Sequence, residues 1–387
     1  MRKSILPIVI AALALCAVSA RATFAATAWS QYGFSSRHTS FNEKETTLTS
    51  GNVANLAFLW AGSVGTPVVS GPTVGLGNVY VAADGKVFAF RASDGASLWS
   101  HLSCSGIGTV QPALGSHALL VGDKGGDLAA YDPATGAQLW CRDESGSITS
   151  PPSINAGVVY ITNGSSVVAV DLKTGNTLWI FTPPDSSRID NTPAVTATTV
   201  YATGGDSLFA LDRTTGHKVW RTNFGRQIFI SAPSVANGLV YVGGNSLFAV
   251  NASTGKLRWT KNNVGAIVSM PAIADGNVFV NAQDPFFGLF AFNAVTGKMM
   301  WRSIYPDEPA GTVTVANGVV YDIADTGDLQ LFDAATGAFL GSLDDPGDLP
   351  FNYDFRIQPA VVNGTVYLPT GNYGGGNRVD AFTLPLP

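Results

Sequence analysis

The sequence predicts an all-β fold, an eight-bladed β-propeller with four-stranded antiparallel blades, and three recurring features predict it. A Tyr, Phe or Leu that follows Val or Leu recurs at intervals of 38 to 46 residues. A Pro stands eight residues before it in most units, and a hairpin turn followed by Trp closes most units. Repeats of about 40 residues that hold four short strands are typical of propeller blades.

The aromatic or aliphatic position and the Pro define eight units along the chain. The aromatic or aliphatic position is occupied by Tyr80, Leu120, Tyr160, Tyr201, Tyr241, Phe279, Tyr321 and Tyr367. The upstream Pro is Pro72, Pro112, Pro152, Pro193, Pro233, Pro271 and Pro359, and the seventh unit has Val313 instead. We expect the innermost strand of each blade to begin at this Pro.

A turn with Asp or Asn first and Thr-Gly last recurs in six units. It spans residues 132–136, 171–175, 212–216, 251–255, 293–297 and 333–337. Asp or Asn opens such a turn by accepting from its own backbone, and Gly supplies the positive φ that closes a hairpin. The first unit keeps a shorter form of the turn, Ser93-Asp94-Gly95. A Trp stands four residues after the turn glycine at Trp99, Trp140, Trp179, Trp220, Trp259 and Trp301. The seventh unit has Gly341 in that place.

The last unit has neither this turn nor a Trp of its own. Residues 53–60, which end in Trp60, supply a strand of the missing kind. We therefore expect an N-terminal strand to join the C-terminal blade, which would close the ring and remove exposed strand edges. Residues 23–387 then form a single domain.

Composition agrees with a compact β protein. Of the 387 residues, 43 are Gly and 13% are charged, about half the usual share. A hydrophobic share of 46% excludes disorder, and the formal net charge of −5 argues against a nucleic-acid partner.

The first 22 residues have the pattern of a secretory signal peptide, with a basic start, an apolar run and Ala20-Arg21-Ala22. Leu15 before Cys16 disfavours a lipoprotein, and no other stretch is long enough to span a membrane. We therefore expect an exported protein, periplasmic or secreted. Cys104 and Cys141 lie 37 residues apart, on neighbouring units, and either form a disulfide or remain two free thiols.

The repeat resembles the PQQ-like family of eight-bladed propellers, named for pyrroloquinoline quinone. Residues 130–140 and 169–179 match its blade motif A-x-D-x-x-T-G-x-x-x-W, and residues 29–33, Arg37 and Trp60 resemble its lead-in. The resemblance implies that the repeated Trp residues, Trp60 included, are structural and dock against the neighbouring blade. It also implies one of three uses: PQQ- and calcium-dependent dehydrogenases, BamB-like assembly scaffolds without a cofactor, and sensory or carbohydrate-binding propellers.

The dehydrogenase alternative requires a free carboxylate as general base. The segment that resembles the family's catalytic stretch is 351–354, where Asn352 occupies the place of the first Asp and only Asp354 remains. The chain has no adjacent Cys pair, and its four His residues form no metal-ligand spacing. We therefore assign no catalytic and no metal-binding residue, although PQQ and Ca²⁺ stay open as the cofactors of this alternative.

Three polar segments before the recurring Pro positions are the candidate partner or ligand loops. Their residues are Arg188, Asp190 and Asn191, then Arg226 and Gln227, then Asn352, Asp354, Arg356 and Gln358. Clustered charge beside aromatic residues suits a protein interface, and the alternative is a solvated loop with an internal Arg–Asp pair. The sequence thus favours a monomeric, non-catalytic scaffold that binds a protein or small ligand at one propeller face. An alcohol or sugar quinoprotein dehydrogenase is the first alternative.

Overall fold

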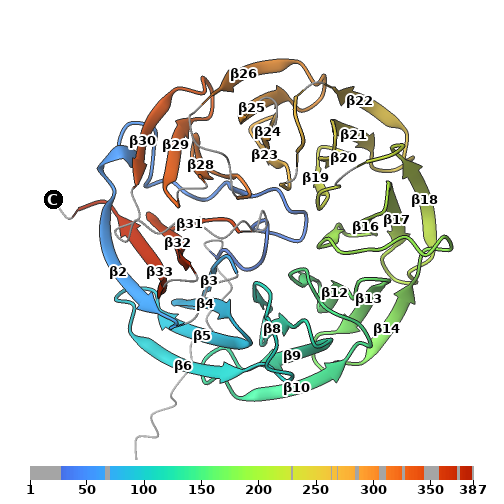
Figure 1. Cartoon of the computed structure of the whole chain (residues 1–387), viewed down its shortest axis with the longest axis horizontal. Coiled ribbons are helices and arrows are strands. Elements are labelled where there is room, and N and C mark those ends of the chain that lie inside the picture. The colour runs from blue at the N-terminus through green and yellow to red at the C-terminus, as the bar shows by residue number, and fades with distance from the viewer. Residues whose placement is uncertain are drawn as a thin grey trace, which may run out of the picture.

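The computed structural model describes residues 28–65, 70–227, 230–262, 264–267, 269–283, 287–304, 311–324, 327–343, 357–372 and 375–385. Residues 1–22, which the sequence predicts to be a signal peptide, lie outside these residues. Eight β-sheets are arranged as blades around a central axis, which confirms the eight-bladed propeller (Figure 1). The described residues include a single helical element, the 3₁₀ turn η1 (Val53–Asn55).

The blades follow one another along the chain, each with its strands in order from the axis outward. Blade 1 holds β3 (Thr73–Gly75), β4 (Asn78–Ala83), β5 (Lys86–Arg91) and β6 (Ser97–Leu102), and blade 2 holds β7 (Ala113–Leu114), β8 (Leu119–Gly122), β9 (Asp127–Tyr131) and β10 (Gln138–Asp143). Blade 3 holds β11 (Ser153–Asn155), β12 (Val158–Thr162), β13 (Val167–Asp171) and β14 (Thr177–Phe181), and blade 4 holds β15 (Ala194–Val195), β16 (Thr199–Gly204), β17 (Ser207–Asp212) and β18 (Lys218–Asn223).

The second half repeats this arrangement. Blade 5 holds β19 (Ser234–Ala236), β20 (Leu239–Val242), β21 (Leu247–Asn251) and β22 (Leu257–Lys261), and blade 6 holds β23 (Ala272–Ala274), β24 (Asn277–Ala282), β25 (Gly288–Asn293) and β26 (Met299–Ser303). Blade 7 holds β27 (Thr314–Ala316), β28 (Val319–Ile323), β29 (Leu329–Asp333) and β30 (Phe339–Leu343), with β1 (Phe41–Asn42) parallel to β27. Blade 8 holds β31 (Ala360–Val362), β32 (Thr365–Asn372), β33 (Gly375–Thr383) and, outermost, β2 (Ala57–Ser63).

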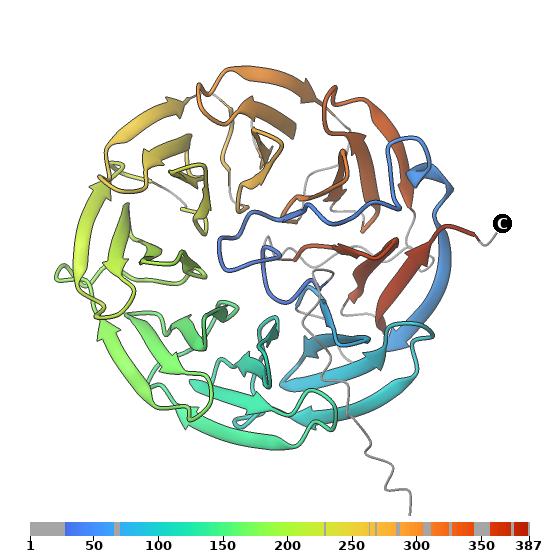
Figure 2. The same cartoon turned by 180° about the vertical axis from the view of Figure 1, so that it is seen from behind.

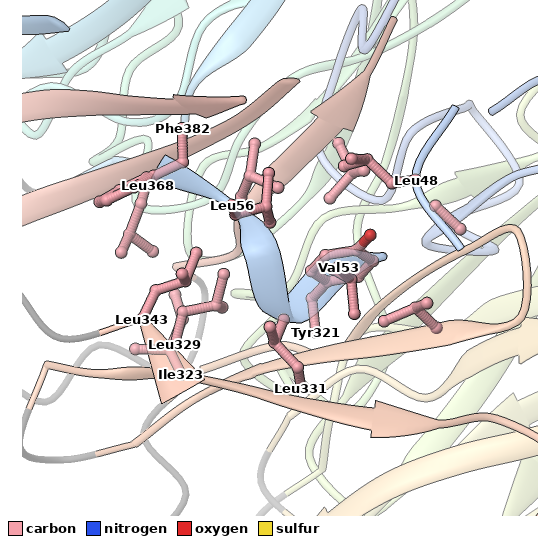
Figure 3. Packing of buried hydrophobic residues seen from close by; sticks show 14 of the residues in the cluster. Leu48, Val53, Leu56, Tyr321, Ile323, Leu329, Leu331, Leu343, Leu368 and Phe382 are labelled. Carbon is pink, nitrogen blue, oxygen red and sulfur yellow. The ribbon is translucent and has the colours of Figure 1, made fainter. Parts of the chain in front are cut away.

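The ring closes in blade 8, where the N-terminal strand β2 pairs antiparallel with the C-terminal strand β33. The closure expected from residues 53–60 is thereby confirmed. Eight buried hydrophobic clusters each join two neighbouring blades, so the core is a ring of interfaces rather than one centre. At the interface of blades 7 and 8, Val53 and Leu56 beside η1 pack among side chains from both blades (Figure 3).

Each repeated Trp ties its blade to the next one. The indole Nε1 of Trp179, for example, donates to the carbonyl of Arg213 at 3.0 Å, in the Asp-x-x-Thr-Gly turn of the following blade. The turn glycine packs on the same indole: a Cβ on Gly216, whose φ is +71°, would approach the Trp179 ring to 2.5 Å. Glycine is therefore required there both for its positive φ and for this close approach.

The same indole-to-carbonyl bond recurs at seven interfaces. The donors and acceptors are Trp60 and Ala92, Trp99 and Pro133, Trp140 and Leu172, Trp179 and Arg213, Trp220 and Ala252, Trp259 and Ala294, and Trp301 and Ala334. The eighth interface, between blades 7 and 8, has no such turn because the outer strand of blade 8 comes from the N-terminus. Gly341 replaces Trp there, and a Cβ on it would lie 3.7 Å from Ala54 in η1.

Residues 29–42, the N-terminal plug, cross the end of the central axis and contact all eight blades (Figures 1 and 2). In six blades a backbone N–H of the innermost strand donates to a plug carbonyl. These bonds run from Val74, Leu114, Val195, Val235, Ile273 and Val315 to Trp29, Ser30, Ser36, Arg37, Thr39 and Ser40. In blade 3, Ile154 N–H donates to Gln31 Oε1 at 2.8 Å, and in blade 8, Asn42 Nδ2 donates to the Val361 carbonyl at 2.8 Å.

The plug lies at one end of the central axis and so makes the two faces of the ring different. Turns between the first two strands of a blade, such as residues 237–238, lie on the side of the plug, here named the plug face. Turns between the second and third strands, such as residues 205–206, and the connections between blades lie at the opposite ends of the strands, on the loop face. The candidate residues of blades 4 and 5 belong to the loop face.

Candidate functional site

The first candidate segment connects β14 to β15 on the loop face. Arg188 is 71% exposed, and its Nε lies 2.6 Å from Asp190 Oδ2. The hydrogen bond and charge of Asp190 raise the pKa of Arg188. An exposed pair of this kind contributes little to stability. Arg188 and Asp190 therefore form the internal ion pair that the sequence allowed as the alternative to a protein interface.

Asn191 holds the two blades together. Its Nδ2 donates to the Ile230 carbonyl at 2.8 Å and to Thr203 Oγ1 at 3.1 Å. The first bond reaches the segment that leads into blade 5, and the second reaches a strand of its own blade. Both amide hydrogens are therefore engaged within the protein.

The second candidate segment follows β18 and is braced by Gln227. Its backbone N–H donates to Asp206 Oδ1 at 2.9 Å, and its Oε1 accepts from Asn245 N–H at 3.0 Å. Its Nε2 donates to the Phe224 carbonyl at 3.1 Å. The neighbouring Arg226 is exposed and has no hydrogen bond or ion pair with any residue that the structure describes.

The turn 205–206 of blade 4 brings the two segments together. Gly205 N–H donates to the Arg188 carbonyl at 3.1 Å, while Asp206 accepts from Gln227. We name the resulting group, residues 185–191, 205–206, 221 and 224–227, the loop cluster. Five of the candidate residues, from Arg188 to Gln227, therefore lie in one place on the loop face.

A second ion pair in the loop cluster was not anticipated from the sequence. Arg221 Nη2 lies 2.5 Å from Asp185 Oδ2, and its guanidinium lies over the Phe209 ring at 5.1 Å. Hydrogen bonds from Ser187 and then the charge of Arg221 lower the pKa of Asp185 to about 2. Arg221 belongs to an outer strand, so nothing in the local pattern of residues 185–191 reveals the pairing.

Of the third candidate segment, Gln358 alone lies among the described residues. Asn352, Asp354 and Arg356 lie outside the described residues. Gln358 is fully buried, and its Oε1 accepts from Ser40 Oγ of the plug at 3.4 Å. Gln358 therefore faces the central axis rather than the surface.

The two cysteines are joined by a disulfide between blades 1 and 2, with their Cα atoms 6.7 Å apart. Cys141 lies in the outermost strand β10, and Cys104 follows the outermost strand β6. The bond thus lies at the outer rim, far from the innermost strands. It cannot cap a cofactor placed on the axis.

The innermost strands present a ring of small side chains, of which the four hydroxyls form hydrogen bonds within the protein. The residue after each Pro position alternates between a hydroxyl and Ala around the ring, and all eight are fully buried: Thr73, Ala113, Ser153, Ala194, Ser234, Ala272, Thr314 and Ala360. Thr73, Ser234 and Thr314 donate to the Pro carbonyl of the next blade. Ser153 instead bonds His38 Nε2 of the plug at 2.8 Å.

PQQ with Ca²⁺ would require a set of oxygen ligands near the axis. Calcium takes six to eight oxygen ligands, several of them carboxylates. In the described part of the chain no three His, Cys, Asp or Glu residues are grouped so that they could hold a metal ion. Three of the four hydroxyls in the ring bond to neighbouring blades and Ser153 bonds to the plug. The buried Gln111 Oε1, Ser269 Oγ and Asn281 Oδ1, by contrast, have no hydrogen-bond partner among the described residues.

A sequence profile described as outer membrane protein assembly factor BamB matches residues 34–222, 204–305 and 286–383. The chain belongs to this family. BamB from Nitrosomonas eutropha is 30% identical over 123 residues, which are 29% of this chain and 28% of that protein. Tetrathionate hydrolase from Acidianus ambivalens is 27% identical over 135 residues, 34% of this chain and 22% of that enzyme. These matches thus span less than a third of either relative's length.

Solved structures of an alcohol dehydrogenase and of a BamB protein share the fold. Quinohemoprotein alcohol dehydrogenase from Comamonas testosteroni superposes with a TM-score of 0.77 at 17% identity, covering 95% of this chain and 82% of that enzyme. BamB from Moraxella catarrhalis superposes with a TM-score of 0.67 at 18% identity, covering 85% of this chain and 99% of that protein. At these identities the likeness concerns architecture alone. Within the residues described, no helix has the length and apolar character to cross a membrane.

Proposed function

We propose that this chain is an exported, non-catalytic propeller that binds a partner protein through the loop cluster and acts as an assembly scaffold. Its relatives in the family carry the name of an outer membrane protein assembly factor. The observation that carries the proposal is the state of Arg226: exposed, without a described partner, on a loop braced by Gln227. Arg on a preorganised surface is a frequent anchor of protein interfaces.

Aromatic side chains support the same role. Phe224 is half-buried and stacks on Phe248 with ring centroids 4.4 Å apart. A rigid aromatic pair beside an exposed cation offers a partner both apolar contact and charge at a low cost in side-chain entropy. The partner chemistry that fits is an acidic group next to an apolar residue.

The carboxylates of the loop cluster are poor candidates for a catalytic base. A general base must be free to accept a proton from substrate. Asp190 is paired with Arg188, and Asp185 is paired with Arg221 and has a pKa of about 2. The third carboxylate, Asp206, accepts from the Gln227 backbone N–H. This arrangement favours binding over acid–base chemistry.

The interface is tested by replacing position 226 with a photo-cross-linking amino acid in the cell that encodes the chain. We expect a discrete adduct with one protein at position 226 and none at position 258. Arg258 is the matched control, because it is also an exposed Arg without a described partner but lies on the outer strand β22. Arg226→Glu should lower the amount of assembled outer membrane proteins, while Arg258→Glu should not. Equal behaviour of both positions would refute this interface.

The dehydrogenase alternative is tested by melting the purified protein with PQQ and Ca²⁺. A ligand at 100 times its Kd stabilises a protein by about 2.7 kcal/mol, which shifts the melting curve measurably. We expect no shift and no dye reduction with a panel of alcohols and sugars. A shift that a chelator abolishes, together with dye reduction, would overturn the scaffold proposal.

A further inference from the structure

A cavity of about 480 Å³ lies on the plug face, between the N-terminal plug and the first turns of blades 5 and 6. It is remote from the loop cluster, because the turns 237–238 and 275–276 lie at the strand ends opposite to the loop face. Its volume is in the range of small-ligand sites. Nothing in the scaffold proposal uses this cavity.

The inner wall of the cavity is apolar and held in place by the fold. Phe34 and Phe41 are both half-buried, and Ile273 lies beneath them with 4% of its surface exposed. Phe34 meets the Trp29 ring edge-on, with centroids 5.2 Å apart, and Phe41 lies in β1, paired with Val315. Phe34 also packs against the hydrophobic cluster of blades 8 and 1, and Phe41 against that of blades 6 and 7, so the fold fixes both side chains that line the cavity.

Phe34 also adopts an unusual backbone conformation, with a φ of 70°. A bulky residue with positive φ is an outlier that persists only where its surroundings fix it. Such conformations concentrate at ligand-binding sites. The hydrogen bonds of the plug to the eight blades supply the restraint here.

The rim of the cavity carries polar side chains that are unused within the protein. Five of them have no hydrogen bond or ion pair between their polar side-chain atoms and any described residue: Ser35, Arg37, Thr39, Asn237 and Asp275. Glu43 completes the rim and has only a loose contact with Lys44 at 3.7 Å. The corresponding turn residue of blade 7, Asn317, instead donates to the Leu48 carbonyl at 2.8 Å. The unused groups are thus a property of this cavity and not of such turns in general.

The charges of the rim select the kind of ligand. One Arg and two carboxylates leave a charge of −1, which Lys44 beside Glu43 offsets. An anion would therefore meet Glu43 and Asp275, and a cation would meet Arg37. A neutral ligand rich in hydroxyl groups avoids both conflicts and can bond to carboxylate, amide, guanidinium and hydroxyl groups at once. The negative face of an aromatic ring attracts the C–H groups on the apolar face of a sugar ring. We propose that this cavity binds a neutral saccharide of mono- or disaccharide size.

The proposal is tested by saturation-transfer NMR of the full mature protein with maltose, cellobiose and diacetylchitobiose as probes. Glycylglycine and inorganic phosphate serve as zwitterionic and anionic probes. We expect ligand enhancements from at least one of the disaccharides and none from glycylglycine or phosphate. No enhancement from the three disaccharides, or binding of glycylglycine or phosphate in their place, would overturn the proposal.

Variants connect the binding to this cavity. Arg37→Gln and Asp275→Asn should each weaken the disaccharide roughly five- to tenfold, the effect of about one lost hydrogen bond. Asn tolerates the φ of 48° at position 275, and Arg37 is exposed, so both variants should keep the melting temperature. Arg258→Gln and Asp212→Asn are the matched controls, since position 258 is on an outer strand and sister turns already carry Asn251 and Asn293. Unchanged affinity in the two cavity variants would place the ligand elsewhere and refute the inference.

Discussion

The Trp contacts between blades allow a matched measurement at two neighbouring interfaces. Trp259 and Trp301 are both half-buried, and their Nε1 atoms donate to Ala294 and Ala334, each at 3.0 Å. The two carbonyl acceptors differ in whether a second group also donates a hydrogen bond to them. Tyr241 OH also donates to the Ala294 carbonyl, at 3.1 Å, whereas the corresponding residue of blade 6 is Phe279, which has no hydroxyl.

Replacing each Trp by Phe should therefore have unequal effects. In Trp259→Phe the buried Ala294 carbonyl keeps the Tyr241 hydroxyl, so the hydrogen-bond loss costs about 0.5–1.5 kcal/mol. In Trp301→Phe the Ala334 carbonyl loses its indole donor, and no hydroxyl replaces it. Ala334 is buried, with 7% of its surface exposed. An unsatisfied buried acceptor costs about 1–3 kcal/mol. The loss of ring size is common to both, so Trp301→Phe should be the more destabilising by about 1 kcal/mol.

Urea denaturation followed by far-UV circular dichroism measures this difference from the two midpoints, provided that the slopes agree. Adding Phe279→Tyr to Trp301→Phe supplies the missing hydroxyl and should recover part of the loss. Adding Tyr241→Phe to Trp259→Phe should bring that variant to the level of Trp301→Phe. Equal destabilisation by the two single variants, or no response to either second change, would refute the reasoning.

Three further predictions concern other buried groups. Burial lowers the pKa of His38 to about 4, from 6.5 when unfolded, so the unfolded chain binds more protons between these values. The free energy of unfolding should fall by up to about 3 kcal/mol as pH drops from 6.5 to 4, and His38→Gln should flatten this dependence in pH-dependent denaturation. Mass spectrometry after alkylation without reductant should find Cys104 and Cys141 unmodified. Their joint replacement by Ser should lower the melting temperature, because a disulfide that spans 37 residues stabilises the folded state by at most about 3–4 kcal/mol. Glu45→Gln should cost about 1–3 kcal/mol in urea denaturation, because the buried Glu45 Oε2 accepts from Gly364 N–H at 3.0 Å and an amide nitrogen there would face a donor. Stability independent of pH, free thiols, or a neutral Glu45→Gln would each contradict the corresponding prediction.

The repeated parts of the fold were predictable because their causes are local. A turn that begins with Asp and ends with Thr-Gly specifies a hairpin by its own backbone chemistry, and the spacing to Trp fixes the outer strand. The exception at Gly341 could be noticed in the sequence but not explained. Its reason is the strand β2, which arrives from the other end of the chain and brings η1 instead of a turn.

The plug could not be predicted in the same way. Its residues have no strand pattern, and its hydrogen bonds join positions far apart in the chain, such as Asn42 and Val361. The lead-in motif marked residues 29–33 and Arg37 as similar to the family without saying what they contact. The loop cluster was predicted in part, because unusual charge marked Arg188 and Arg226, whereas the partner of Asp185 lies on an outer strand.

The seam between blades 7 and 8 explains why the plug and the closing strand belong to one continuous segment. This interface lacks the indole-to-carbonyl bond of the other seven, so it needs other contacts. Residues 41–63 supply them: β1 extends blade 7, Asn42 and Glu45 bond to blade 8, and η1 fills the space before β2. Because blade 8 combines both ends of the chain, its pairing has the longest loop to close and brings the greatest entropic cost. A segment that bonds to all eight blades and then continues into the seam offsets that cost, because its bonds to the other blades hold β2 close to β33.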